Sequence, residues 1–281
     1  LYFMSRPTVV SNFFEETRRQ TLEERFQSES FELRAFNNWL KNAIYSRFVL
    51  HSDRILDFGS GRGGDLGKFK GIGHYTGIDS SADSIADAGR KGTPYKKDLL
   101  VGSFLDEALV TRLKSEVFDV FIFSFSIQFV NSAARLRSWF TEFSPRSVII
   151  FTTDEHTLKT KVNHKRDFSN QLLHVRKASG TYEFSLTDSL SQVEEYPFDS
   201  EGMTNLLSNQ GYDLVRSENF RHVFDEGEWK KDCSLFRELV KGDIVDVPVN
   251  DKRDQIWGDI PFDLRSRLKL GKAVHTVPYR A

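Results

Sequence analysis

A glycine-rich segment that follows a short apolar run carries the residues best suited to chemistry. It reads Arg54-Ile55-Leu56-Asp57-Phe58-Gly59-Ser60-Gly61-Arg62-Gly63-Gly64-Asp65. The apolar run predicts a buried strand ending near a carboxylate, and the glycines predict a tight turn whose backbone can approach a ligand closely. About 20 residues later, His74 to Asp79 predicts a second strand ending in an acid, the spacing at which a carboxylate binds a ribose diol. The segment therefore predicts a site for an adenosine-bearing cofactor.

Asp57 distinguishes between two classes of such cofactors. Gly59, Gly61 and Gly64 satisfy the G-x-G-x-x-G pattern of dinucleotide sites, but a carboxylate two residues before the first glycine would repel a pyrophosphate. The same carboxylate would attract the sulfonium and ammonium groups of S-adenosylmethionine (SAM). The pattern therefore favours SAM over NAD. An NAD oxidoreductase and a glycine turn that only shapes a loop are the less favoured interpretations.

The composition excludes several classes of protein. The chain has 281 residues, a net charge of −1, seven histidines without metal-ligand spacing and one cysteine, Cys233. A single cysteine cannot form an internal disulfide or a cysteine zinc cluster. No apolar run reaches membrane-spanning length and no signal peptide is evident, so we expect a soluble, intracellular protein that contacts no membrane. At this net charge, any RNA contact must come from a local basic groove.

Strand and helix signals alternate through the first half of the chain. Two helices are expected within residues 11–50, and then strands at 54–58, 74–79, 94–98, 118–126 and 146–153, with helices near 63–70, 81–90, 103–115 and 132–143. Such alternation predicts an α/β fold of the Rossmann-like type. Its sheet is mostly parallel and twisted, with helices on both faces.

After Thr153 the pattern changes. We expect a hairpin from 172–178 and 181–187, a helix at 199–209, a strand at 212–215, a helix at 226–240, a loop at 243–268 and an edge strand at 273–279. Residues 1–10, which begin Leu1-Tyr2-Phe3 before Met4, are interpreted as a tag remnant and tail. Residues 11–281 are interpreted as a single domain in which 154–198 form an insertion.

Two motifs in this order resemble those of the mRNA cap (guanine-N7) methyltransferases, which are class I SAM-dependent enzymes. Residues Arg34 to Lys41 reproduce R-x-F-N-N-W-x-K, and Gly59 to Leu66 reproduce G-x-G-K-G-G-D-L with Arg62 in place of the lysine. The resemblance covers residues 31 to 220 and is strongest over 34–80. It implies transfer of a methyl group from SAM to N7 of the guanine cap of RNA.

The resemblance also implies a cofactor site. Its members are Lys41, Asp57, Gly59, Gly61, Asp79, Asp98, Ser124 and Phe129. Lys41 would hold the SAM carboxylate, Asp79 the ribose hydroxyls, and Asp98 the adenine. Lys41 as a solvated surface residue, Asp98 as a turn residue and Phe129 as a core residue remain open as alternatives.

Cap recognition is implied for a second set, which comprises Arg34, Asn37, Asn38, Arg62, Gln128 and Glu195. Glu195 is preferred to its neighbour Glu194 because of its place in Val193–Phe198, and a carboxylate there can accept both N1–H and the exocyclic amine of guanine. The alternative is that both are solvated loop charges. Arg62 is interpreted as a phosphate ligand because no acidic partner is evident nearby. The sequence departs from the family at Gln128-Phe129, where a His-Tyr pair is usual.

Guanine N7 carries a free lone pair and no proton, so the implied reaction needs no general base and no catalytic residue is assigned. We expect an in-line transfer driven by positioning, with the basic segment Lys159–Arg166 as an RNA contact or an ordinary solvated face. Two further alternatives are a methyltransferase for another acceptor and a catalytically weak regulatory subunit. Expected partners are the capped RNA 5′ end and other capping-enzyme domains or subunits, in a nucleus or in the cytoplasm if the protein is viral.

Overall fold

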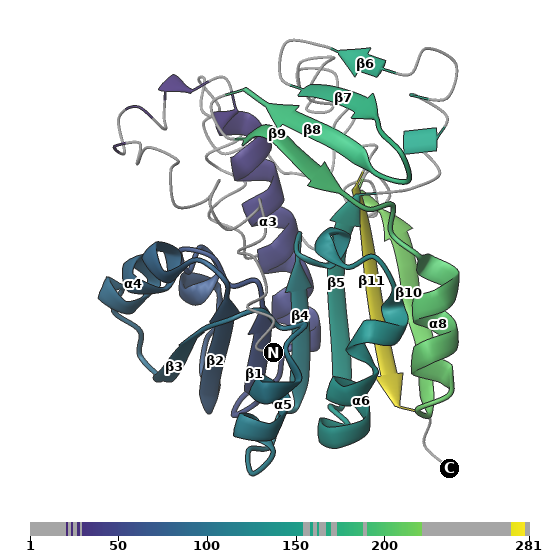
Figure 1. The fold of residues 1–281 in the computed structure, drawn as a ribbon. Helices are drawn as coiled ribbons and strands as arrows, with labels where there is room; N and C mark the ends of the chain where they lie inside the picture. Colours follow the sequence, from purple (N-terminus) through teal and green to yellow (C-terminus); the bar gives the residue numbers. More distant parts are fainter. Residues whose placement is uncertain are drawn as a thin grey trace, which may run out of the picture.

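A seven-stranded sheet forms the centre of the computed structural model (Figure 1). The strand order is β10-β11-β5-β4-β1-β2-β3, with β1 Arg54–Phe58, β2 His74–Asp79, β3 Lys96–Val101, β4 Val120–Ser124, β5 Ser147–Thr153, β10 Tyr212–Asn219 and β11 Gly271–Pro278. The structure describes residues 21, 24, 27, 28, 30–153, 158, 159, 162, 167–169, 173–187, 190–220 and 271–278. Neighbouring strands from β3 to β5 are parallel, whereas β11 runs antiparallel to both β5 and β10.

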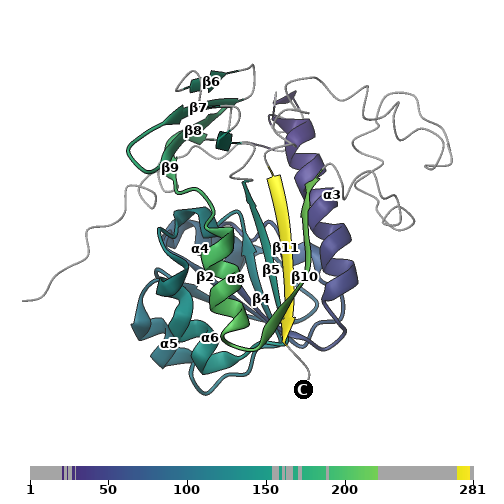
Figure 2. The same cartoon turned by 90° about the vertical axis from the view of Figure 1, so that its right-hand side faces the viewer.

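Helices cover both faces of this sheet, as predicted (Figure 2). One face packs against α3 Phe31–Phe48 and the inner side of α4 Ala82–Arg90. The other packs against α5 Glu107–Leu113, α6 Arg137–Phe143 and α8 Ser200–Ser208. The helix α3 forms because its apolar residues recur at helical spacing, and they point into the core: Leu33, Phe36, Leu40 and Ile44 are each at most 3% exposed.

The alternation of strand side chains places the buried acid of β1 on the face that α3 covers. Ile55 belongs to the core on the α3 side, and Leu56 and Phe58 belong to the core on the opposite side. Because successive side chains of a strand point to opposite faces, Asp57 shares the α3 face with Ile55. The same face carries Tyr75 of β2, which is also buried. A carboxylate is thereby placed under the glycine turn and close to the helix.

A second, smaller sheet follows β5. It contains β6 Asp167–Ser169, β7 Leu173–Lys177, β8 Tyr182–Leu186 and β9 Leu190–Glu195, all antiparallel in that order. The predicted hairpin is confirmed as β7 and β8, and the sheet has its own apolar core with Val175 and Phe184 at its centre. In Figure 1 the small sheet lies above the end of the central sheet where β5 finishes.

Three expectations about secondary structure are wrong. Residues 63–70 form turns and the short 3₁₀ helix η1 Leu66–Lys68 in place of a full helix, because Gly63 adopts a φ of +67° that an α-helix excludes. The strand expected at 94–98 is β3, which spans 96–101. The last strand is not at the edge of the sheet, since β11 lies between β5 and β10 and β10 is the edge strand.

Other boundaries agree closely. The helices at 81–90 and 199–209 correspond to α4 and α8, and the region 132–143 contains η3 Ala133–Leu136 followed by α6. The expected helix 103–115 is shorter, as α5. The second of the two helices expected within 11–50 is α3; most of the first, together with the helix 226–240 and the loop 243–268, lies outside the described residues.

Candidate active site

The glycine turn after β1 adopts a backbone that requires glycine. Gly59 has a φ of +77° and Gly61 a φ of +51°. A Cβ on residue 59 would lie 2.5 Å from Cβ of Ser126, so the backbone there is packed tightly against the segment after β4. A Cβ on residue 61 would meet no described heavy atom within 4 Å. The turn is therefore closed beneath Gly59 and open beside Gly61, where a ligand can approach the backbone.

Asp79 is held at the end of β2 by two backbone donors. Its Oδ2 accepts from the N–H of Gly61 at 2.8 Å and its Oδ1 from the N–H of Ser81 at 2.9 Å. Burial raises the pKa of this carboxyl, while both hydrogen bonds lower it. Because each carboxylate oxygen has a further lone pair, Asp79 can still accept from a ribose hydroxyl. Its assignment to the ribose stays a prediction.

Asp57 is almost completely buried and only partly satisfied. Its side chain receives a hydrogen bond from Tyr75 Oη at 2.6 Å on Oδ2, whereas Oδ1 has no hydrogen-bond partner among the described residues. Burial, followed by the negative charge of Asp65, raises the pKa of Asp57 to about 7; the Tyr75 hydrogen bond and the Lys41 charge act in the opposite direction. A buried carboxylate with one open oxygen indicates a binding position for a donor or a cation.

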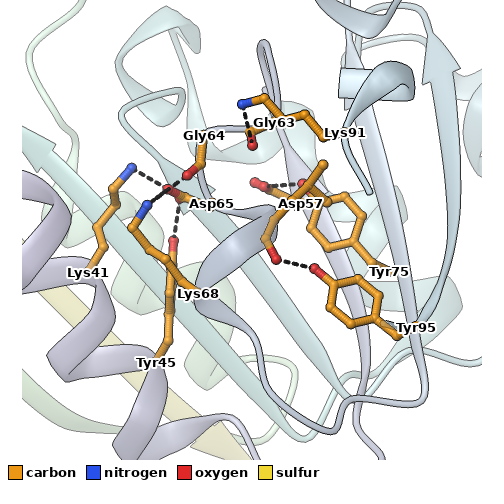
Figure 3. Close-up of polar contacts among 11 residues, drawn as sticks. Lys41, Tyr45, Asp57, Gly63, Gly64, Asp65, Lys68, Tyr75, Lys91 and Tyr95 are labelled. Atoms are coloured by element: carbon orange, nitrogen blue, oxygen red, sulfur yellow. Dashed lines mark hydrogen bonds and ion pairs between the residues drawn. The ribbon is translucent and has the colours of Figure 1, made fainter. Parts of the chain in front are cut away.

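A second buried acid in the same turn was missed by the sequence analysis. Asp65 lies behind the glycines and is surrounded by Lys41 and Tyr45 of α3 and by Lys68 of η1 (Figure 3). Burial raises its pKa, but the two ammonium groups outweigh burial, and the pKa lies below its usual range. The signal was present in the sequence, since Asp65 belongs to the G-G-D-L motif, but a motif does not show which lysines reach it.

Lys41 was predicted to bind the cofactor carboxylate, and the structure shows what holds it in place. Its Nζ lies 2.6 Å from Asp65 Oδ1, and its side chain is 14% exposed. The solvated-surface alternative is therefore wrong. The lysine is fixed beside the glycine turn from the middle of α3, and its cofactor role stays a prediction.

Residues 124–129 connect the glycine turn after β1 with the small sheet. Ser124 is the last residue of β4, and the backbone then bends at Phe125, whose φ is +57°. Ser126 Oγ donates to the carbonyl of Phe58, and η2 Ile127–Phe129 follows. Phe129 is half-buried. The segment that carries Ser124 and Phe129 therefore lies against the glycine turn.

Two of the predicted cap ligands, Gln128 and Glu195, are brought together from distant parts of the chain. The Tyr196 N–H donates to the Gln128 carbonyl at 2.7 Å, and Thr153 Oγ1 donates to Glu195 Oε2 at 3.4 Å. Glu195 is 2% exposed and Gln128 3%. Glu194 is instead exposed and accepts from Thr181. The interpretation of Glu195 as a solvated loop charge is therefore wrong.

The remaining predicted cap ligands lie on the helix and the turn. Arg34, Asn37 and Asn38 are half-buried on α3, within the same stretch as Lys41. Arg62 does have a local acid, contrary to the expectation: its Nε lies 3.7 Å from Asp87 Oδ2 of α4. The acid was overlooked because it is 25 residues away in the sequence and is brought close only by the packing of α4.

Asp98 is not where an adenine-binding acid was expected. Because β3 continues to Val101, Asp98 lies in its interior, opposite Thr76, and its exposed carboxylate contacts His74 Nε2 at 2.9 Å. The residues at the carboxyl end of β3 are Val101, which pairs with Asp79, and then Gly102. The structure therefore separates Asp98 from the other predicted ligands. Of the basic segment 159–166, only Lys159 and Val162 are described.

The described residues include no group of three or more His, Cys, Asp or Glu side chains arranged to hold a metal ion. Within the same part of the chain, no helix combines the length and the apolar character needed to cross a membrane.

Comparisons with known proteins show what the chain is similar to. Residues 4–133 match the mRNA (guanine-N(7))-methyltransferase domain family. The mRNA cap guanine-N(7) methyltransferase of Cryptococcus neoformans is 26% identical over 263 residues, which cover 82% of this chain and 42% of that protein. The mRNA cap guanine-N(7) methyltransferase 1 of Arabidopsis thaliana is 30% identical over 155 residues, or 50% of this chain and 40% of the relative.

The fold resembles that of a solved methyltransferase structure. The plantazolicin methyltransferase BamL, crystallised in complex with a triazolic desmethylPZN analog and SAH (S-adenosylhomocysteine), superimposes with a TM-score of 0.52 at 15% identity, covering 98% of this chain and 96% of that one. At this identity the likeness supports the fold alone. The chain spans about two fifths of the length of the fungal and plant relatives. The match over residues 4–133 contains both predicted motifs, so this part of the chain is similar to the mRNA (guanine-N(7))-methyltransferase domain family.

Proposed function

We propose that this protein transfers the methyl group of SAM to N7 of the guanine cap of RNA. The observation that carries the proposal is the arrangement at one edge of the sheet. There the glycine turn after β1 and the buried pair Gln128 and Glu195 are joined by residues 124–129. The family match supports the same activity, because the named relatives are mRNA cap guanine-N(7) methyltransferases.

The residues of the glycine turn fit SAM. The unpartnered oxygen of Asp57 suits a cationic group, the open space beside Gly61 allows close approach of a ligand to the backbone, and Asp79 retains free lone pairs toward the turn. Lys41 provides a cation for the carboxylate of the cofactor. When bound, SAM supplies an electrophilic methyl group attached to a positively charged sulfur.

The buried residues Gln128 and Glu195 suit guanine. A carboxylate can accept from both N1–H and the exocyclic amine, and no other base offers two adjacent donors in this form. Glu195 occupies a buried position at the end of β9 beside Thr153 of β5. The buried Oε1 of Gln128 has no hydrogen-bond partner among the described residues, so it is a further acceptor, on a residue whose backbone is bonded to Tyr196, next to Glu195. Gln128 therefore retains a polar contact where the family usually has histidine.

The chemistry at N7 requires alignment and no proton transfer to the protein. Holding two reactants in line can lower a barrier by about 7–11 kcal/mol, so positioning can supply most of the required rate. The positive charge moves toward the guanine ring during transfer, and the carboxylate of Glu195, if ionised, would stabilise it. Arg62 is placed on the turn to contact cap phosphates, although its pairing with Asp87 must then loosen.

The proposal is tested by incubating the protein with isotope-labelled SAM and either GpppA or ApppA, followed by mass spectrometry of the products. We expect a label on the guanine base of GpppA, located at N7 by fragmentation, and none on ApppA. Label transfer only to another acceptor would favour a different methyltransferase. SAM binding without any transfer would favour a regulatory subunit.

The partners and the compartment follow from this proposal. The capped 5′ end of RNA is the substrate, and other capping-enzyme domains or subunits are the partners we expect. The compartment would be a nucleus, or the cytoplasm if the protein is viral. Co-purification of a triphosphatase or guanylyltransferase activity from the native source would support such an assembly.

A further inference from the structure

One carboxylate in the structure is shared by two lysines. Asp65 Oδ1 lies 2.6 Å from Lys41 Nζ and 2.9 Å from Lys68 Nζ, and Asp65 Oδ2 accepts from Tyr45 Oη at 2.8 Å (Figure 3). Lys68 Nζ also donates to the Gly64 carbonyl at 2.7 Å. The lysines come from different elements, since Lys41 belongs to α3 and Lys68 to η1.

The charges of this cluster do not cancel. The side chains of Asp65, Lys68 and Lys41 are 6%, 8% and 14% exposed, so all three are largely removed from water. Within these three side chains, two ammonium groups and one carboxylate leave an excess of one positive charge, which the neighbouring carboxyl of Asp57, with a pKa of about 7, offsets only in part. A buried charge without a counter-ion is unfavourable, so the cluster should attract an anion. Burial lowers the pKa of Lys68, as does the charge of Lys41, while Asp65 raises it, which is the pattern expected of two cations competing for one acid.

The excess charge can reach a ligand through Lys41. Lys68 is the more buried of the two lysines and has the Gly64 carbonyl as a second partner. Lys41 is more exposed and is the residue to which the cofactor carboxylate is assigned. If Lys41 turns toward a ligand, Asp65 keeps Lys68 and Tyr45 as partners and is not left as an uncompensated buried charge.

We propose that Lys68 is a positioning residue for cofactor binding, which satisfies Asp65 so that Lys41 is free to bind the carboxylate of SAM. This inference rests on the proposed function. Without Lys68, Asp65 would retain Lys41 as its only cation, the cluster would be neutral, and the site would lose its preference for an anion. The effect is confined to the amino-acid end of the cofactor.

Two ligands separate this role from general stabilisation. SAH carries the carboxylate, whereas 5′-methylthioadenosine has the same adenosine and thioether but no amino-acid end. We expect Lys68→Met to weaken SAH binding by about 10-fold in titration calorimetry, equivalent to about 1.4 kcal/mol, and to leave methylthioadenosine binding unchanged. Lys68→Arg, which keeps the charge, should recover most of the loss.

A double variant sharpens the test. In Asp65→Asn with Lys68→Met, residue 65 no longer requires a cation, so Lys41 is free again and SAH affinity should return toward the wild-type value. Lys97→Met is the matched control. Lys97 is another half-buried lysine, its Nζ contacts the Ala88 and Gly89 carbonyls at the end of α4, and its loss should leave the ratio of the two affinities unchanged.

Each contrary outcome has a distinct meaning. If wild-type protein fails to bind SAH, the proposed function is overturned, and this inference with it. If wild-type protein binds SAH but Lys68→Met weakens both ligands equally, or neither, Lys68 has only a structural role and the inference is wrong. Failure of the double variant to recover SAH affinity, with a thermal unfolding midpoint equal to that of the control, would also contradict it.

Discussion

The two sides of the candidate site use buried acids in different surroundings. On the cofactor side, Asp65 is paired with two lysines, and Asp57 lies close enough to feel the charges of Asp65 and Lys41. On the proposed guanine side, the contacts of Glu195 include a threonine hydroxyl, and the carbonyl of Gln128 accepts from a backbone N–H. The first arrangement suits a ligand that carries formal charges, and the second suits a neutral base edge that offers hydrogen-bond donors.

This difference means that the two sides can be disabled independently. Variants on the guanine side should change the acceptor reaction without changing cofactor affinity. Variants on the cofactor side should change affinity for SAM in a way that depends on charge and pH.

The largest effect is expected for Glu195→Gln. The glutamine amide carries no negative charge, and its NH2 group is a donor that cannot pair with the N1–H or the amine of guanine. A mismatched hydrogen-bonding partner in a polar site reduces the reaction strongly. We expect kcat/KM for GpppA to fall by about 100-fold or more, with SAH affinity unchanged in calorimetry. Glu194→Gln, the exposed neighbour, is the control and should retain activity. Equal loss in both variants would argue against the assignment of guanine to Glu195.

A smaller, pH-dependent effect is expected at Asp57. Its pKa in the folded protein is about 7, and a cationic ligand favours the ionised carboxylate, so SAM affinity should rise as the pH increases from about 6 to 8. The charged groups around it are Asp65, Asp79 and Lys41, and the neutral hydroxyl of Tyr75 donates a hydrogen bond to it. Asp57→Asn should remove this rise and bind SAM more weakly. A SAM affinity that is independent of pH in the wild type would contradict a charge contact at Asp57.

The same titration predicts how stability changes with pH. The folded protein holds the Asp57 proton more tightly than the unfolded chain, in which the pKa of this carboxyl has its ordinary value of 3.8. The contribution of this group to stability is therefore present at low pH and is lost as the pH rises through about 4 to 7. Asp57→Asn should flatten that part of the unfolding free energy curve, measured by denaturant titration.

A moderate loss of stability is expected for Gly59→Ala. The φ of +77° is unfavourable for alanine, and its Cβ would meet Ser126 at 2.5 Å. We expect destabilisation by about 1–3 kcal/mol, measured by thermal unfolding. Gly61→Ala is the informative comparison, because its Cβ would meet no heavy atom of the described residues within 4 Å. It should cost less stability and mainly reduce SAH affinity. Equal stability losses would show that the turn is not open at Gly61.

The smallest effect is expected for Asp98→Asn. This carboxylate is exposed on β3 and contacts His74, away from the carboxyl end of the strand. The change should alter SAH affinity and stability by less than about 0.5 kcal/mol. A clear loss of SAH affinity would show that the adenine site extends farther along β3 than the strand register indicates.

The cofactor side could be predicted largely from sequence because its parts are close in the chain. The segment from Asp57 to Asp65 contains the end of the strand, the glycine turn and the acid that follows it. The apolar pattern predicted the bounds of β1 and β2 without error. Errors occurred where local signals compete. Gly63 and its neighbours prevented the expected helix. The sequence from Lys96 to Val101 carries no clear signal for where the strand ends, so Asp98 was predicted at the end of the strand but lies in its interior.

The sequence by itself determined the alternation of the first strands and helices, the parallel direction of those strands, the glycine turn and the resemblance to the cap methyltransferases, because these depend on residue types at short separations. Only the tertiary structure decided that Lys41 and Lys68 share Asp65, that Arg62 lies near Asp87, and that Glu195, and not Glu194, is buried beside Thr153. It also decided that β11 enters between β5 and β10. The physical reason is that pairing between distant segments depends on how helices and strands pack. Local propensity does not specify that packing.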